Sequence, residues 1–174
     1  MYEGWGMDIA IRQAEDGDAP ACAEVHVEGW ALAYRDTPLR DHLVRRSPED
    51  RASIWTKLLA DHASGKRLWV ATKGGDVVGL VAAGPGRAGA PDAFDVYALY
   101  QRASVLGTGV AKMLLDHAVA DARSRAARTF GAWSLVENRA ASAFYERCGW
   151  TALGERTTDH EGSPIVERRY ECML

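Results

Sequence analysis

The chain has 174 residues, of which 47% are hydrophobic and 26% are charged, and its formal net charge at pH 7 is −3. This length suits one domain with a real core, and this charge argues against a nucleic-acid-binding protein, which needs a basic face. No apolar run approaches the roughly 18–20 residues of a membrane-spanning helix. We therefore expect one soluble domain over residues 8–174, after a loose leader at residues 1–7, with no nucleic-acid or membrane partner.

The cysteines and histidines point away from disulfides and metals. Cys22, Cys148 and Cys172 are odd in number, widely spaced and without a CxxC pair. This pattern favours a reduced, cytoplasmic protein. The five histidines form no HExxH motif and no close pair with carboxylates at ligand spacing, so we expect no metal site.

The first third of the chain is predicted to be a strand and two helices. Residues 9–14 alternate apolar and polar side chains, as a half-buried strand does. Residues 16–20 hold an acidic cap and an early proline, typical of a helix start, and helical spacing continues to about Tyr34. Ser47 begins a second helix, which Gly65 closes. Its predicted buried stripe comprises Ile54, Trp55, Leu58 and Leu59.

The middle of the chain is predicted to be a hairpin, a strand and a long helix. Two strand-like runs, residues 68–72 and 77–83, are joined by the glycine-rich turn 73–76 that hairpins prefer. Residues 94–100 form a third predicted strand. The helix that follows has apolar and small residues at spacings of three and four. Its predicted stripe comprises Val110, Met113, Leu114, His117, Ala118 and Asp121.

The last third is predicted to alternate between strand and helix. Residues 129–136 form a strand and residues 138–148 a helix, while two final strands, 151–154 and 165–171, flank the loop 159–164. Strands and helices mixed around one sheet, with an antiparallel majority, indicate an α/β domain of the α+β type.

The glycine turn from Leu106 to Lys112 is a candidate phosphate site. Gly107 and Gly109 can adopt backbone angles closed to other residues, so their amides can approach a ligand closely. These amides and the dipole of the following helix favour a pyrophosphate, although glycines also serve plain tight turns. Neither a P-loop nor a dinucleotide fingerprint fits, because Gly109 is followed by Val110 and no third glycine is present.

The helix from Asn138 to Cys148 offers an amide and a phenol. Asn138 and Tyr145 are about two helical turns apart and therefore share one face. A phenol with a pKa of about 10 can protonate the leaving group of an acyl carrier. Asn138 also suits a helix cap, and Phe144 and Tyr145 also suit packing against the sheet. We expect catalysis for Tyr145 and core packing for Phe144.

In this order the two stretches resemble the Gcn5-related N-acetyltransferase (GNAT) family. Residues 106–111 look like the family's Gln/Arg-x-x-Gly-x-Gly/Ala motif, and the helix looks like its Asn-x-x-Ala-x-x-Phe-Tyr-x-x-x-Gly-Phe segment. Residues 98–100 resemble its splayed strand, and the likeness covers residues 8–172. It implies the GNAT fold, a mixed and mainly antiparallel sheet of about six to seven strands with about four helices.

The resemblance implies acetyl-CoA as the acetyl donor. Its pantetheine arm would run beside the third predicted strand like an added strand. Leu106 stands where the family has Gln or Arg, but we expect binding to persist because the remaining contacts there are backbone amides. The implied cofactor-binding residues are Leu99, Tyr100, Gln101, Leu106, Gly107, Thr108, Gly109, Val110, Ala111, Lys112 and Asn138.

The resemblance further implies direct acetyl transfer to a primary amine, with Tyr145 as the general acid. The general base is either Asp95 or Glu28, and a solvated surface carboxylate is the alternative for each. Strand alternation would place Asp95, Tyr97 and Leu99 on one face, which favours Asp95.

The acceptor amine is less well defined by the sequence. Trp30 and Tyr34 are candidate acceptor contacts, although aromatic stripes also build cores, and the loop 159–164 is either a lid over the acceptor or a plain hairpin turn. We prefer a small-molecule amine. The alternatives are a protein N-terminal or lysine acetyltransferase and a non-catalytic acyl-CoA sensor. A homodimer is an option that no sequence feature settles.

Overall fold

The computed structural model describes residues 8–37, 39–40, 47–87, 90, 92–160 and 162–174, so the predicted leader lies outside the described residues. The strands form one seven-stranded sheet in the order β1-β2-β3-β4-β5-β7-β6. Neighbouring strands are antiparallel except β4 and β5, which run parallel. This confirms the mixed, mainly antiparallel α+β fold.

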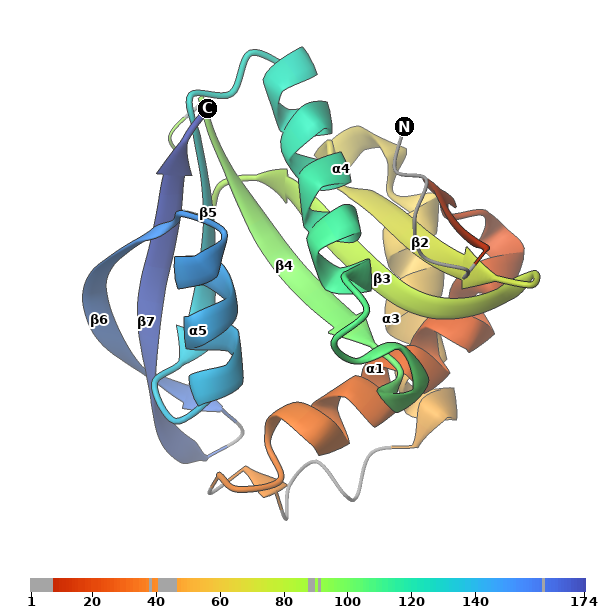
Figure 1. Cartoon of the computed structure of the whole chain (residues 1–174), viewed down its shortest axis with the longest axis horizontal. Coiled ribbons are helices and arrows are strands. Elements are labelled where there is room, and N and C mark those ends of the chain that lie inside the picture. Colours follow the sequence, from red (N-terminus) through yellow and green to blue (C-terminus); the bar gives the residue numbers. More distant parts are fainter. Residues whose placement is uncertain (1–7, 38, 41–46, 88–89, 91, 161) are drawn as a thin grey trace.

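The strands and helices follow the predicted order along the chain (Figure 1). The strands are β1 (Ile9–Gln13), β2 (Arg67–Lys73), β3 (Asp76–Pro85), β4 (Ala93–Gln101), β5 (Thr129–Leu135), β6 (Thr151–His160) and β7 (Ser163–Met173). The α-helices are α1 (Ala19–Ala33), α3 (Pro48–Ala60), α4 (Val110–Ser124) and α5 (Arg139–Arg147). Among the described residues, no helix has both the length and the apolar character needed to cross a membrane.

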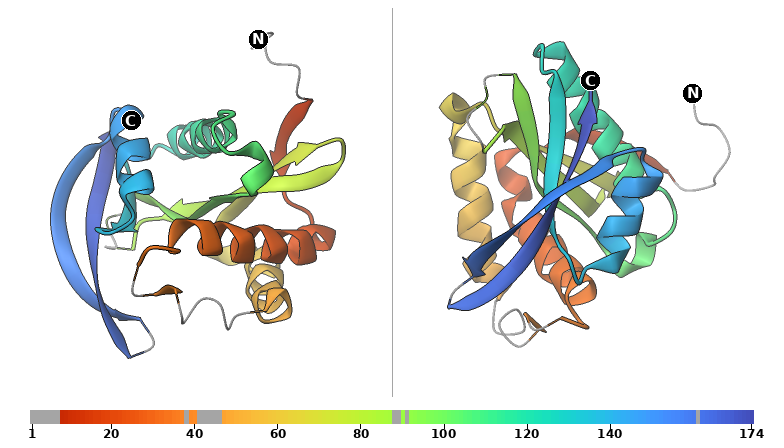
Figure 2. Two further views of the ribbon diagram at one scale, coloured as in Figure 1. Left: turned by 60° about the horizontal axis from the view of Figure 1, so that its bottom comes forward. Right: turned by 90° about the vertical axis from the view of Figure 1, so that its left-hand side faces the viewer.

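The sheet is covered on both faces, and each face has its own core. Figure 2 shows α4 above the sheet and α1 and α3 below it, with α5 beside β5 and β7. One core joins α4 and α5 to the sheet around Phe130, Leu114 and Tyr170. The other joins α1 and α3 to the opposite face around Trp55 and Leu80.

Two predicted helix stripes were partly wrong. In α3, Ile54 is exposed and Arg51 is buried instead. In α4, Met113 and His117 are exposed and Asp121 is only half-buried, whereas Leu115 and Ala122 face the core. The reason is that spacings of three and four fit several neighbouring stripes, and only the sheet decides which of them is buried.

Two predicted boundaries also differ. Helix α3 ends at Ala60, and Gly65 ends a separate 3-10 turn, because the Asp61 side chain accepts a hydrogen bond from the Ser64 amide. Strands β6 and β7 extend into the predicted loop 159–164, leaving only two residues between them. Cross-strand pairing therefore makes the described part of this segment the end of a hairpin.

Strands β4 and β5 pair for only part of their length, and this creates a fork in the sheet. Their pairing ends at Val96 and Ala132, after which the two strands diverge (Figure 1). A β-bulge also interrupts β4, because Val96 pairs with Ala83 while Ala98 pairs with Ala82. The bulge corrects the predicted alternation: Tyr97 packs on the α1 side of the sheet, and Leu99 packs on the α4 side.

Candidate active site

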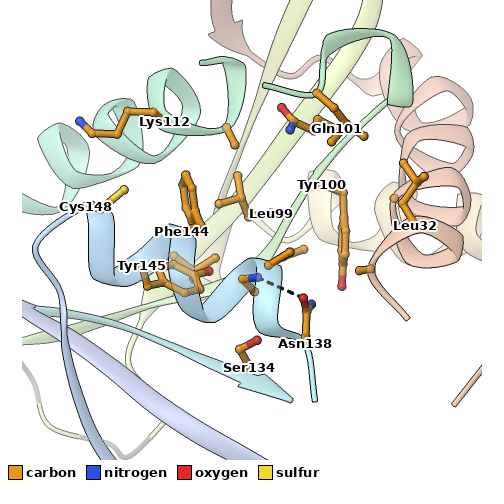
Figure 3. Close-up of a pocket in the computed structure, with 18 of the residues that line it drawn as sticks. Leu32, Leu99, Tyr100, Gln101, Lys112, Ser134, Asn138, Phe144, Tyr145 and Cys148 are labelled. Carbon is orange, nitrogen blue, oxygen red and sulfur yellow. Dashed lines mark hydrogen bonds between the residues drawn. The ribbon is translucent and has the colours of Figure 1, made fainter. Parts of the chain in front are cut away.

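A cavity of about 730 Å³ lies in the fork between β4 and β5. Leu99, Phe144 and Tyr145 meet in its middle (Figure 3). One end lies beside α4 and the other beside α1. The labelled side chains at these ends are Lys112 and Cys148 beside α4, and Tyr100 and Leu32 beside α1. The cavity therefore runs from the glycine turn, through the fork, to the end of the first helix.

The glycine turn forms the wall at the α4 end. Gly107 and Gly109 both have positive φ, 74° and 90°, and Gly109 is the N-cap of α4. The amides of Leu106 and Thr108 donate to carbonyls of the preceding turn, so they are already engaged. In the described part of the chain, the amides of Gly107 and Gly109 donate to no carbonyl. Two of the predicted backbone donors are therefore unavailable, and the glycine amides remain for a ligand.

Not every residue of the turn contributes a side chain to the cavity. Leu106 lines the opening and is exposed, whereas Thr108 and Val110 lie outside the lining. The Thr108 hydroxyl donates to the carbonyl of Val105 over 2.7 Å, and Val110 is buried in the core. Lys112 lines the cavity and forms an ion pair with Asp116 over 2.6 Å.

Glu28 anchors the start of this turn and does not line the cavity. One of its carboxylate oxygens accepts a hydrogen bond from the Ala103 amide over 2.7 Å, and the other pairs with Arg102 over 3.2 Å. Arg102 in turn donates to the carbonyl of Val77 in β3. These contacts hold the turn against α1 and the sheet, which indicates a structural role for Glu28.

The edge of β4 forms the floor of the cavity. Leu99, Tyr100 and Gln101 all line it, and β5 does not pair with this part of the strand. The Gln101 side-chain oxygen is buried and accepts no hydrogen bond from the described residues. A buried acceptor without a donor is costly, so this site suits a ligand that carries an N–H group.

Asn138, the N-cap of α5, and Tyr145 within this helix both line the cavity. The Asn138 oxygen caps the helix by accepting from the Ala141 amide over 3.1 Å, which leaves its amide nitrogen for a ligand (Figure 3). The Tyr145 ring stacks on Tyr170 at 5.4 Å, and its hydroxyl bonds to no described residue. Burial raises the pKa of Tyr145 above its ordinary value, so the phenol stays protonated at neutral pH.

Of the two residues predicted to contact the acceptor, only one lines the α1 end of the cavity. Tyr34 lines the cavity, and Trp30 lies behind it. The Trp30 indole donates a hydrogen bond to the Tyr100 hydroxyl and packs at the edge of the Tyr34 ring. Burial raises the pKa of Tyr34 well above its ordinary value. Trp30 therefore supports the wall that Tyr34 and Tyr100 form.

Asp95 is placed in a buried ion pair away from the cavity. It is 1% exposed, and one oxygen pairs with Arg169 over 2.6 Å while the other accepts from the Arg87 amide over 2.9 Å. Gly131 makes room for this contact, because a Cβ there would lie 2.2 Å from the Arg169 guanidinium. With both oxygens engaged, Asp95 stabilises the sheet where the fork begins.

Several lining residues were not predicted. Trp133 and Ser134 of β5 lie across the fork from β4, and Arg147 of α5 also lines the cavity. Phe144 also lines the cavity in addition to its predicted packing. No motif singles these residues out. Their position depends on how far β4 and β5 diverge, which is a property of the whole sheet.

A family model described as the Acetyltransferase (GNAT) family matches residues 29–150, more than half of the chain. The chain belongs to the GNAT family. This match confirms the resemblance and covers both β4 and the two motifs that line the cavity. A comparison of this GNAT chain with curated proteins gives no match.

Solved structures share the fold at low sequence identity. Ribosomal-protein-alanine N-acetyltransferase from Brucella melitensis is 23% identical, with 95% of this chain and 99% of that chain covered and a TM-score of 0.73. PaiA N-acetyltransferase from Thermoplasma acidophilum, solved in complex with coenzyme A, is 16% identical, with 93% and 98% covered and a TM-score of 0.70. YncA from Salmonella typhimurium, solved with its cofactor acetyl-CoA, is 19% identical, with 96% and 94% covered and a TM-score of 0.73.

Proposed function

We propose that this GNAT chain is an acetyl-CoA-dependent N-acetyltransferase that transfers acetyl directly to a primary amine of a small molecule. The observation that carries this proposal is the fork itself, where Tyr145 lies between the glycine turn at one end and Tyr34 at the other. One ligand at the turn and another at α1 would therefore meet beside a phenol. Similar structures that contain coenzyme A or acetyl-CoA support the identity of the donor.

The residues present fit the donor. The unpaired edge of β4 suits an extended amide-containing arm, and the buried oxygen of Gln101 lacks an N–H partner that such an arm would supply. The amides of Gly107 and Gly109 and the N-terminus of α4 suit a pyrophosphate. When bound, acetyl-CoA would supply an activated acetyl thioester.

The chain's own groups then have separate tasks. The glycine turn and β4 hold and orient the donor, while the Asn138 amide nitrogen can bond to its arm. The Tyr145 phenol gives its proton to the sulfur that leaves. The opposite end of the cavity, beside Tyr34, receives the amine.

A sensor that binds acyl-CoA without turnover is the alternative. The retained phenol favours catalysis, because the Tyr145 hydroxyl faces the cavity and bonds to no described residue. A protein N-terminus or a lysine side chain remains a further candidate acceptor, and the small-molecule preference is part of the proposal.

Two measurements test the function. Acetyl-CoA at 100 times its Kd should stabilise the protein by about 2.7 kcal/mol and raise its Tm, and an unchanged Tm at millimolar acetyl-CoA would remove the donor assignment. Release of the CoA thiol should then be followed across a panel of amino acids, polyamines, aminoglycosides and lysine peptides. Tight acetyl-CoA binding without turnover of any of these amines would favour the sensor.

A further inference from the structure

The β6–β7 hairpin carries two similar ion pairs on opposite faces. Arg156 pairs with Glu167 over 2.7 Å, and Arg168 pairs with Glu155 over 2.6 Å. These are adjacent positions of one antiparallel ladder, so their side chains point to opposite sides of the sheet. The Arg156 guanidinium lies 3.9 Å from the centre of the Trp133 ring, which lines the cavity. Glu167 is therefore on the face that continues from the cavity.

One carboxylate oxygen of Glu167 accepts hydrogen bonds, and the other accepts none from the described residues. Both hydrogen bonds from Arg156, of 2.9 and 2.7 Å, go to Oε2, while no described residue bonds to Oε1. The side chain is 18% exposed, so water can reach it. This distinguishes it from Asp95 and Glu28, in which both oxygens accept bonds from the protein.

Glu167 does not itself line the cavity, but it lies next to residues at the amine end. It is opposite Leu135 in the β5–β7 ladder, and Leu135 packs in a small cluster with Tyr34. After burial and the Tyr100 hydroxyl, the Glu167 charge also raises the pKa of Tyr34. Among the described residues, the titratable groups that interact with Glu167 are Arg156 of β6, through the ion pair, and the Tyr34 phenol after α1; Arg169 follows two residues along β7, on the same face, and pairs with Asp95 and Glu171.

We propose that Glu167 receives the proton of the acceptor ammonium through an intervening water. This assignment rests on the proposed function. The ammonium first gives one proton to Glu167, and the neutral nitrogen attacks the acetyl carbon. The N–C bond forms and the C–S bond breaks. The sulfur takes the Tyr145 proton, the second amine proton restores that phenol, and Glu167 returns its proton to solvent.

Glu167→Gln tests the assignment, with Glu155→Gln as the matched control because it breaks the same type of ion pair on the other face. The Glu167 variant should lose about 10²-fold in kcat/KM for the amine at pH 7. The loss should shrink between pH 7 and pH 10, because the neutral fraction of an alkyl amine with a pKa of about 10.4 rises several-hundred-fold over this range. The KM for acetyl-CoA should not change. Glu155→Gln should stay within about twofold of the native chain at every pH.

The outcomes separate this proposal from the proposed function. Native turnover with equal rates in both variants, or an equal loss at every pH, would overturn only the Glu167 assignment. Native protein that binds acetyl-CoA but acetylates no amine would overturn the proposed function and the assignment with it. Thermal unfolding of both variants with acetyl-CoA checks that the hairpin is intact, and Arg156→Gln, which keeps the carboxylate, should retain more activity than Glu167→Gln.

Discussion

Tyr145 is held by the fold in a setting that suits proton donation. Its ring packs against Tyr170 and Trp150, with ring centres 5.4 and 5.1 Å apart, so the side chain has little freedom to rotate away. Its hydroxyl faces the cavity and has no described hydrogen-bond partner. The core therefore orients the ring, while the polar atom remains available for a reacting group.

Replacing Tyr145 by Phe should separate catalysis from binding. We expect kcat to fall about 10²-fold, because the proton donor is lost. Stability should change by less than about 0.5 kcal/mol, because the stacked ring remains and no hydrogen bond within the described chain is broken. Steady-state kinetics, titration calorimetry with acetyl-CoA and urea unfolding measure the three quantities. A native-like kcat would remove Tyr145 as the acid.

The element that prepares the donor site is the turn between β4 and α4. Gly107 and Gly109 have positive φ angles and line the cavity, and Glu28 fixes the first residues of the turn through the Ala103 amide. An N-terminal helix dipole and oriented amides act together only while this backbone path is maintained. The turn is therefore sensitive to changes that add a Cβ, even where space is free.

Gly109→Ala tests this sensitivity, and Gly75→Ala in the β2–β3 turn is its matched control. Their φ values are 90° and 96°, and no atom lies within 4 Å of an added Cβ at either site. Both variants should lose about 1–2 kcal/mol of stability from left-handed strain. Only Gly109→Ala should also weaken acetyl-CoA binding, by about tenfold, through displaced amides. Equal Kd values for the two variants would contradict a donor site at this turn.

For the whole molecule, a buried histidine behind the cavity makes the stability of the fold depend on pH. His26 of α1 is 6% exposed and stacks on Tyr100 of β4 at 4.8 Å. Neither of its ring nitrogens has a partner among the described residues. Burial first, and the Arg51 charge second, lower the pKa of His26 to about 3. The folded chain therefore holds this imidazole neutral.

This burial predicts a loss of stability in mild acid. Unfolded chains bind the proton near pH 6.5 and the native fold only near pH 3, so the contribution is complete above pH 6.5 and declines below it. The loss of unfolding free energy by pH 5 should amount to about 2 kcal/mol. Urea unfolding at pH 7 and pH 5 should show a drop smaller by about this amount in His26→Phe, whereas exposed His62→Gln should match the native drop. Equal drops in all three proteins would contradict the effect.

Features that depend on neighbouring residues could be predicted from the sequence. The hairpin at Gly74 and Gly75, the cap at Asn138 and the positive φ at Gly109 follow from local conformational preferences, so short motifs were enough to predict them. The order of the two motifs then indicated the family. Element ends and helix stripes were less certain, because Gly65 and Ile54 each fitted more than one local structure.

The way in which the two halves of the cavity meet depends on contacts between distant parts of the chain. The bulge at Tyr97 depends on pairing with β3, and the fork depends on where β5 stops pairing with β4. Asp95 became part of a buried ion pair because Arg169, 74 residues away, reaches it across Gly131. Such contacts are set by sheet register and close packing, which balance interactions across the chain and leave no local pattern in the residues themselves.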